Sequence, residues 1–210
     1  MADFKELAGL VISGDVEKVI STTRQMLDAG EDPMKIINEG LINGINVIGE
    51  RFKEGEIYVP EMMMAAQAMK SGMELAKEKV EGSDIPTAGK VIMGTVAGDL
   101  HDIGKNLVAM MLESSGFNVV DLGVDVEADK FIAAVREHNA QVIGMSALLT
   151  TTMPAMKEVI EALKEDGLRS NVKVMIGGAP VTQDYADEIG ADGFAADAGI
   201  AIDLCKQLVG

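Results

Sequence analysis

Apolar residues recur every three or four positions from residue 1 to about residue 80, which is the spacing of helices that bury one face. Asp15 is placed to cap a helix that ends at Gly30, and Asp32 with Pro33 begins the next one, because proline is favoured at the first helical position. This third helix carries a stripe of apolar residues at helical spacing, namely Ile37, Leu41, Ile45, Ile48 and Phe52. A fourth helix begins at Pro60. We therefore predict a four-helix bundle over residues 1–82.

The pattern changes after residues 83–89, a polar stretch with Pro86 and Gly89 that we interpret as a linker. Short apolar runs then alternate with amphipathic stretches. The runs are 90–96, 117–123, 141–147, 172–178 and 192–196, and the amphipathic stretches lie near 105–115, 127–138, 153–166, 182–189 and 198–208. This alternation is typical of parallel strands joined by crossover helices. Residues 90–210 are therefore predicted to form a doubly wound, flavodoxin-like α/β domain with five parallel strands.

Composition and charge exclude several classes of partner. The formal net charge of −16 argues against nucleic acid, because binding to phosphates needs clustered Lys and Arg. The N-terminus has acids where a signal peptide is basic, and no apolar run approaches the ~20 residues of a membrane span. We expect a cytoplasmic protein that does not bind membranes. The single cysteine, Cys205, has no partner at metal-ligand spacing and is expected to be buried in the last helix.

The candidate chemistry follows the first predicted strand, in the sequence Gly98-Asp99-Leu100-His101-Asp102-Ile103-Gly104. Open parallel sheets bind ligands beyond the carboxyl ends of their strands, so a histidine here is displayed above the sheet. Asp99 is close enough to accept a hydrogen bond from one imidazole nitrogen, which is how proteins orient a metal-binding histidine. The motif by itself leaves a metal ligand, a catalytic base and an ordinary loop histidine open.

The ends of the third and fourth strands narrow this choice. Small and hydroxyl residues gather there, namely Ser146, Ala147, Thr150, Thr151, Thr152, Gly177 and Gly178. Simple packing would use Val, Leu or Ile at such positions. We therefore predict a deep slot between the sheet and its helices, next to His101.

Together the three strand ends, Asp99-x-His101-x-x-Gly104, Ser146-x-Leu148 and Gly177-Gly178, resemble the signature of cobalamin-binding domains that hold the cofactor base-off and His-on. The resemblance implies that His101 is the lower axial ligand of cobalt, that Asp99 is its carboxylate partner and that the hydroxyl of Thr152 extends this relay. The slot for the displaced nucleotide tail would be formed by Ser146, Leu148, Thr150, Gly177 and Gly178. Asp102, Ile103 and Gly104 would contact the cofactor beside the ligand.

Residues 52–69 resemble the helical cap that precedes the cobalamin domain in methyltransferase-type corrinoid proteins. In that family the cap covers the upper face of the corrin. The candidate cap contacts are Tyr58, Met62 and Met63, although a plain role in the bundle core stays open for each methionine. The two resemblances cover nearly the whole chain.

The family resemblance implies a methyl carrier and not a complete enzyme. Such a carrier takes a methyl group from a C1 substrate through one methyltransferase, holds it as methylcobalamin or a related methylated cobamide, and delivers it to tetrahydrofolate or a thiol through another methyltransferase. A reductive activator is an expected further partner. The alternatives are the small subunit of an adenosylcobalamin-dependent mutase, a cobalamin-dependent sensor and a response-regulator-like domain. The mutase has no place for a methionine-rich bundle. The sensor shares the layout of bundle and domain but would need an output module, and this strongly acidic chain shows no basic helix-turn-helix. The response-regulator-like domain leaves the slot and His101 unexplained.

Overall fold

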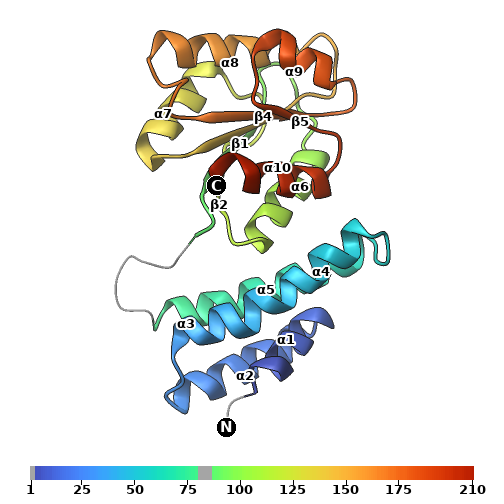
Figure 1. The fold of residues 1–210 in the computed structure, drawn as a ribbon, viewed down its shortest axis with the longest axis vertical. Helices are drawn as coiled ribbons and strands as arrows, with labels where there is room; N and C mark the ends of the chain where they lie inside the picture. Colours follow the sequence, from blue (N-terminus) through green and yellow to red (C-terminus); the bar gives the residue numbers. More distant parts are fainter. Residues whose placement is uncertain (1–2, 80–86) are drawn as a thin grey trace. The chain divides into compact units, whose positions relative to one another are not determined.

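The computed structural model describes residues 3–79 and 87–210, and the chain divides into two compact units, 1–86 and 87–210. Residues 83–86 of the predicted linker lie outside the described residues. The first unit is drawn in blue to cyan and the second in green to red in Figure 1.

The described residues of the first unit, 3–79, form helices joined by turns, and the helix caps follow from the sequence. Its elements are α1 (Phe4–Ile12), α2 (Val16–Asp28), α3 (Pro33–Lys35), the π-helix η1 (Ile36–Ile42), α4 (Asn43–Lys53) and α5 (Val59–Lys77). The carboxylate of Asp15 accepts a hydrogen bond from the backbone N–H of Lys18 at 3.1 Å, and that of Asp32 accepts one from Met34 at 2.8 Å. These bonds satisfy donors that a helix N-terminus leaves unpaired.

The predicted third helix is present, but a π-helical segment interrupts it. α3, η1 and α4 run on from one another, so the stripe from Ile37 to Phe52 crosses a stretch with more residues per turn than an α-helix. Gly40 and Gly44 explain the close packing here. A Cβ atom at Gly40 would lie 2.6 Å from Leu7 Cδ2, and one at Gly44 would lie 2.7 Å from the carbonyl oxygen of Ala8.

The second unit is a five-stranded parallel sheet in the order β2-β1-β3-β4-β5, the flavodoxin-like arrangement that the strand pattern predicts. The strands are β1 (Lys90–Thr95), β2 (Asn118–Asp121), β3 (Val142–Ser146), β4 (Lys173–Gly177) and β5 (Gly193–Ala195). The helices are α6 (Ile103–Ser114), α7 (Ala128–His138), α8 (Pro154–Glu165), α9 (Gln183–Ile189) and α10 (Ala198–Val209).

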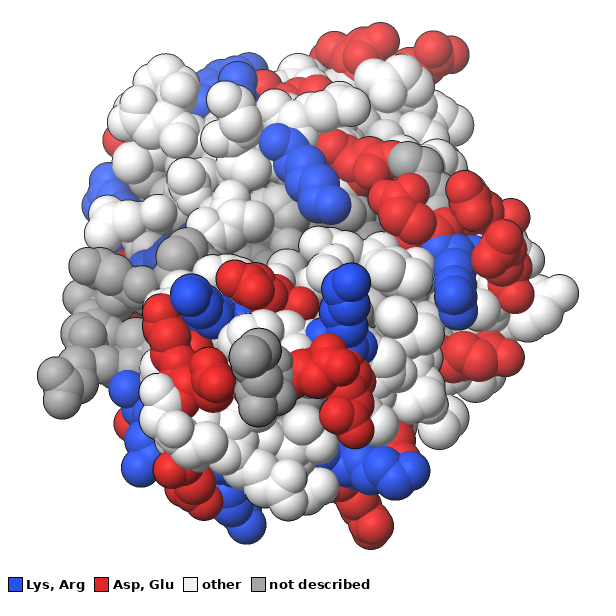
Figure 2. Space-filling view, turned by 60° about the horizontal axis from the view of Figure 1, so that its bottom comes forward, with Lys and Arg blue, Asp and Glu red and all other residues white. Residues whose placement is uncertain are grey.

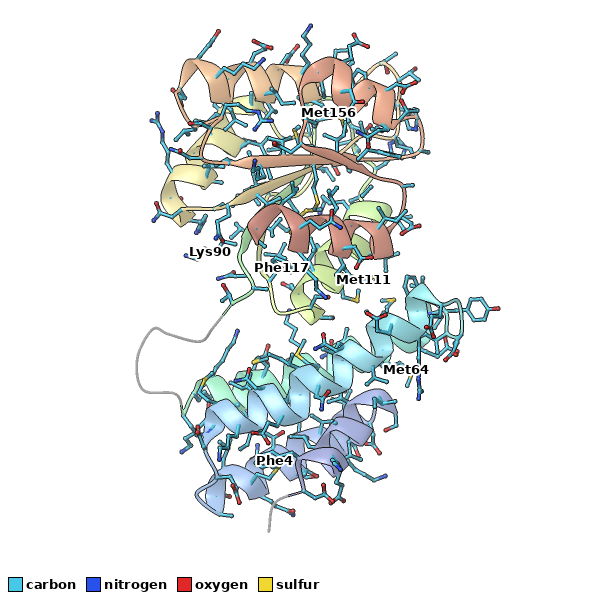
Figure 3. All side chains as sticks on the ribbon, viewed as in Figure 1. Phe4, Met64, Lys90, Met111, Phe117 and Met156 are labelled. Carbon is cyan, nitrogen blue, oxygen red and sulfur yellow. The ribbon has the colours of Figure 1, made fainter. Side chains whose placement is uncertain are left out.

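Helices cover both faces of this sheet. α7, α8 and α9 lie on one face, and α6 and α10 lie on the other (Figure 1). Met156 on α8 belongs to the core on the first face and Met111 on α6 is buried on the second (Figure 3). Since both faces are buried, the strands read as nearly continuous apolar runs. Cys205 is buried in α10, as predicted.

The surface is predominantly acidic, as the net charge requires. On the face shown in Figure 2, groups of Asp and Glu side chains lie beside scattered Lys and Arg side chains. Among the helices of the described residues, none is long and apolar enough to cross a membrane.

Candidate functional site

A cavity of about 590 Å³ lies in the second unit, where the carboxyl ends of β1, β3 and β4 meet α6 and α10. This is the switch point of the sheet, because the chain runs outward to β2 on one side of β1 and to β3 on the other. Most of the predicted ligand-binding residues line the cavity, namely His101, Asp102, Ile103, Gly104, Ser146, Leu148, Gly177 and Gly178.

Asp99 and His101 form the pair that their spacing predicts. Asp99 is fully buried, and its Oδ1 lies 2.7 Å from Nδ1 of His101. The same oxygen accepts the backbone N–H of His101 at 3.1 Å. The imidazole itself is 51% exposed at the cavity. The carboxylate therefore fixes both the backbone and the ring of one residue.

The second oxygen of Asp99 binds the loop after β3. Its Oδ2 accepts the backbone N–H groups of Leu148 at 2.8 Å and Leu149 at 3.2 Å, and the hydroxyl of Thr152 donates to it at 2.7 Å. Burial by itself raises the pKa of this carboxyl, but the hydrogen bonds from Thr152, His101 and Leu148 lower it further than burial raises it. Its pKa lies well below the ordinary range, so Asp99 is ionised at neutral pH.

An ionised Asp99 determines which nitrogen of His101 carries the proton. A carboxylate without a proton can only accept, so Nδ1 of His101 is the donor and Nε2 keeps a free lone pair. The backbone is held as well, since the hydroxyl of Thr95 donates to the carbonyl oxygen of His101 at 3.1 Å and lies 3.0 Å from Oγ of Ser146. His101 thus presents an oriented nitrogen that can bind a metal.

Apolar side chains surround this imidazole and face outward. Leu100 is 69% exposed, Ile103 is 87% exposed and Leu148 is 44% exposed, and all three line the cavity. An exposed apolar patch of this kind marks a surface that a ligand or partner covers. The arrangement fits a ligand with an apolar surface that places a metal against His101.

The start of α6 is fixed by an ion pair between a buried lysine and an exposed aspartate, which the sequence analysis did not identify. Lys105 has a side chain only 1% exposed, and its ammonium group pairs with Asp121 of β2. It also donates to Oδ1 of Asn106 at 2.6 Å, and Nδ2 of Asn106 donates to Asp102 at 2.9 Å. These contacts hold the first turn of α6, and with it one wall of the cavity, against the sheet.

Two domain-sized segments of the chain match known B12-binding sequences. Residues 89–203 match the B12 binding domain, and residues 4–77 match a second B12 binding domain family. The chain belongs to the B12-binding corrinoid proteins. It is 48% identical to dimethylamine corrinoid protein 1 of Methanosarcina acetivorans, over 98% of this chain and 96% of the relative.

Solved structures of corrinoid proteins have the same fold as this one. The methanol:cobalamin methyltransferase complex of Methanosarcina barkeri matches with a TM-score of 0.89 and 35% identity, over 97% of this chain and 78% of that chain. A cobalamin-binding protein of Desulfitobacterium hafniense matches with a TM-score of 0.77 and 32% identity over the whole of both chains. These likenesses support the fold and the corrinoid cofactor of a methyltransferase system.

Some predicted site residues of this corrinoid protein lie away from the cavity. Thr150 is exposed and does not line it, whereas its neighbour Thr152 is buried against Asp99. Met62 is only 1% exposed in the core of the bundle, so the prediction that its side chain contacts the corrin is not supported. Tyr58 and Met63 are exposed on the bundle, as a contact role requires.

Sequence reasoning also missed residues of this corrinoid protein that line the cavity or support its histidine. Alternation along β1 places Thr95 on the cavity face, and this signal was available in the sequence. The cavity lining also includes residues of β1, β4, β5 and α10, namely Met93, Met175, Ala195, Ala198 and Ala201.

Proposed function

We propose that the protein binds a cobamide base-off and His-on and carries methyl groups between methyltransferases. One observation carries this proposal: His101 presents its Nε2 at the mouth of a deep cavity, among exposed apolar side chains, while ionised Asp99 holds its other nitrogen. When bound, the cobamide supplies a cobalt centre that can accept and release a methyl group.

The residues of the cavity then have separate tasks. His101 would be the protein ligand below cobalt, and Asp99 with Thr152 would keep its ring oriented. Leu100 and Ile103 would support the lower face of the corrin. The cavity would take the displaced nucleotide tail, because Ser146 and Gly177 leave room and offer polar groups at its mouth.

Electron paramagnetic resonance of the cobalt(II) form tests the assignment of the ligand. We expect hyperfine splitting from one axial nitrogen, and labelling histidine with nitrogen-15 should change this splitting. His101→Ala should abolish the change while leaving much of the binding. His138→Ala is the matched control, since the other histidine of the chain lies on α7 and does not line the cavity. A spectrum that does not respond to the label would exclude a histidine ligand.

We propose methylamines as the source of the methyl group and a methylamine methyltransferase as the first partner. The support is the 48% identity to a dimethylamine corrinoid protein, compared with 35% to the chain in the methanol methyltransferase complex. Delivery to tetrahydrofolate or a thiol through a second methyltransferase completes the proposed cycle. Mixing the reduced cofactor-loaded protein with dimethylamine and a dimethylamine methyltransferase should release one monomethylamine for each methyl group transferred to the cofactor. Turnover only with a methanol methyltransferase would contradict this assignment.

The exposed side chains of the bundle support a role as a cap. Tyr58 and Met63 are exposed on the unit that matches a B12 binding domain, and we propose that they protect the upper face of the cofactor. Removing residues 1–80 should then leave a unit that still binds the cobamide but loses its methyl group faster in light. A bundle with its own B12-binding match also favours the methyl carrier over the mutase subunit.

A further inference from the structure

A row of residues across the sheet forms the floor of the cavity. Met93 of β1, Gly144 of β3 and Met175 of β4 are paired in register, and all three line the cavity. Residues two positions further along each strand point to the same face, so Ser146 and Gly177 lie above this row, at the mouth. We call Met93, Gly144 and Met175 the methionine floor.

The two methionine side chains occupy the space that Gly144 leaves empty. A Cβ atom at Gly144 would lie 2.3 Å from Sδ of Met93 and 3.0 Å from Cε of Met175. Both thioethers therefore reach over the central strand from its two neighbours. Each methionine is only 3% exposed, so the floor is apolar and its side chains are almost fully buried.

The mouth of the cavity is bounded by rigid backbone, whereas its methionine floor is bounded by flexible side chains. At the mouth, Gly178 has a φ of 129°, and a Cβ atom there would lie 1.9 Å from the carbonyl oxygen of Ala147, so fixed backbone sets the width. At the floor, unbranched methionine side chains with three rotatable bonds set the depth. A group that enters the cavity meets a rigid opening and an adjustable end.

We infer that the methionine floor makes the protein tolerant of the base at the end of the nucleotide tail, so that it takes cobamides with benzimidazole, purine or phenolic bases. The inference rests on the proposed function. Because His101 supplies the axial nitrogen in that function, the base need not bind cobalt, and only its size and shape decide whether it fits. Met93 and Met175 are then the residues that set this specificity.

Affinities for three purified cobamides test the inference. We would titrate the intact protein with cobamides that carry 5,6-dimethylbenzimidazole, adenine or p-cresol and measure each Kd by absorbance. The wild-type values should agree within about threefold, because the thioethers can move by rotation about single bonds. The Met93→Ile, Met175→Ile double variant replaces them with β-branched side chains of similar size that are stiff at χ1. This variant should bind the cobamide with the bulkiest base, dimethylbenzimidazole, at least about tenfold more weakly than the cobamide with p-cresol.

Two controls keep the result interpretable. Met156→Ile alters a buried methionine on the opposite face of the sheet and should leave all three affinities unchanged. Gly144→Ala alone would push the side chain of Met93 aside and should reduce affinity for the bulkiest base most, so it replaces the double variant if that variant does not fold.

Two outcomes would overturn the inference. One is a wild-type preference of more than about tenfold for one base, and the other is a floor variant that weakens all three cobamides equally. The proposed function fails in a different way: the protein would then bind none of the cobamides, or the axial nitrogen would come from the base instead of from histidine.

Discussion

Replacing Gly104 with alanine should change protein stability and cobamide affinity in opposite directions. Gly104 is the second residue of α6, it is exposed, and it lines the mouth of the cavity. A Cβ atom at this position would meet no atom within 4 Å, and its φ is not in the left-handed region. The protein alone therefore has room for a methyl group here, and only a ligand that covers the position could clash with it.

The two effects of this substitution have opposite signs. Alanine is favoured over glycine in a helix by up to about 1 kcal/mol, and about half of that is reasonable in a first turn. The melting temperature should then rise by about 1–2 °C. Forcing one methyl group into a packed contact costs about 1–3 kcal/mol, so cobamide affinity should fall about 5- to 150-fold. Gly104→Leu enlarges the obstruction and should weaken binding more.

The assay pairs thermal unfolding of the protein without cofactor with a cobamide titration. Gly9→Ala is the matched control, because Gly9 lies in α1, its added Cβ would also meet no atom within 4 Å, and it is far from the cavity in the chain. It should raise the melting temperature and leave the affinity unchanged. If Gly104→Ala and Gly104→Leu both bind cobamide within twofold of wild type, no ligand covers this turn, and the proposed placement of the corrin is refuted.

Two further predictions concern buried groups. Thr152→Ala removes a hydrogen bond to buried Asp99 and should lower the free energy of unfolding by about 1–3 kcal/mol at pH 7, as measured with urea. Since the pKa of Asp99 is lowered in the fold, its contribution to stability is present above about pH 4 and is lost as the pH falls from there through the lowered value; Asp99 is ionised at both pH 7 and pH 5, so Thr152→Ala should cause the same loss at both, and a loss that disappears at pH 5 would contradict this reasoning. Burial raises the pKa of the Cys205 thiol to about 12, so iodoacetamide should label it at pH 8 only after unfolding, and stability should fall as the pH rises from about 9 toward 12. Rapid labelling of the folded protein would show that α10 opens readily.

The elements of the fold were predictable because each depends on local pattern. Short apolar runs such as Val142–Ser146 are what a strand buried on both faces needs, and the amphipathic stretches between them need the sheet as a partner. The pair of Asp99 and His101 was predictable for a similar reason. Two residues that are two positions apart in the turn after a strand lie close together because the chain connects them. The neighbouring strand end places Ser146 beside this turn.

The parts that could not be predicted depend on the path of loops and on packing around whole helices. Nothing local distinguishes exposed Thr150 from buried Thr152, because the turn after β3 decides which hydroxyl reaches Asp99. Met62 and Met63 are neighbours on α5, where a rotation of about 100° separates core from surface. The ion pair of buried Lys105 with Asp121 joins residues from different elements, and neither residue has a distinctive neighbour in the sequence.

The carboxylate of Asp99 divides its two oxygens between His101 and the loop that begins at Leu148. Because both contacts use one carboxylate, the position of the loop and the orientation of the imidazole are energetically coupled, and this coupling acts equally in both directions. If His101 is the axial ligand, as proposed, a protein that docks on the loop and prefers one arrangement of it would change the strength of that ligand, and ligation of His101 would change the affinity of that protein by the same factor. A tenfold effect in either direction amounts to about 1.4 kcal/mol, which is comparable with the net contribution of one hydrogen bond to a charged group.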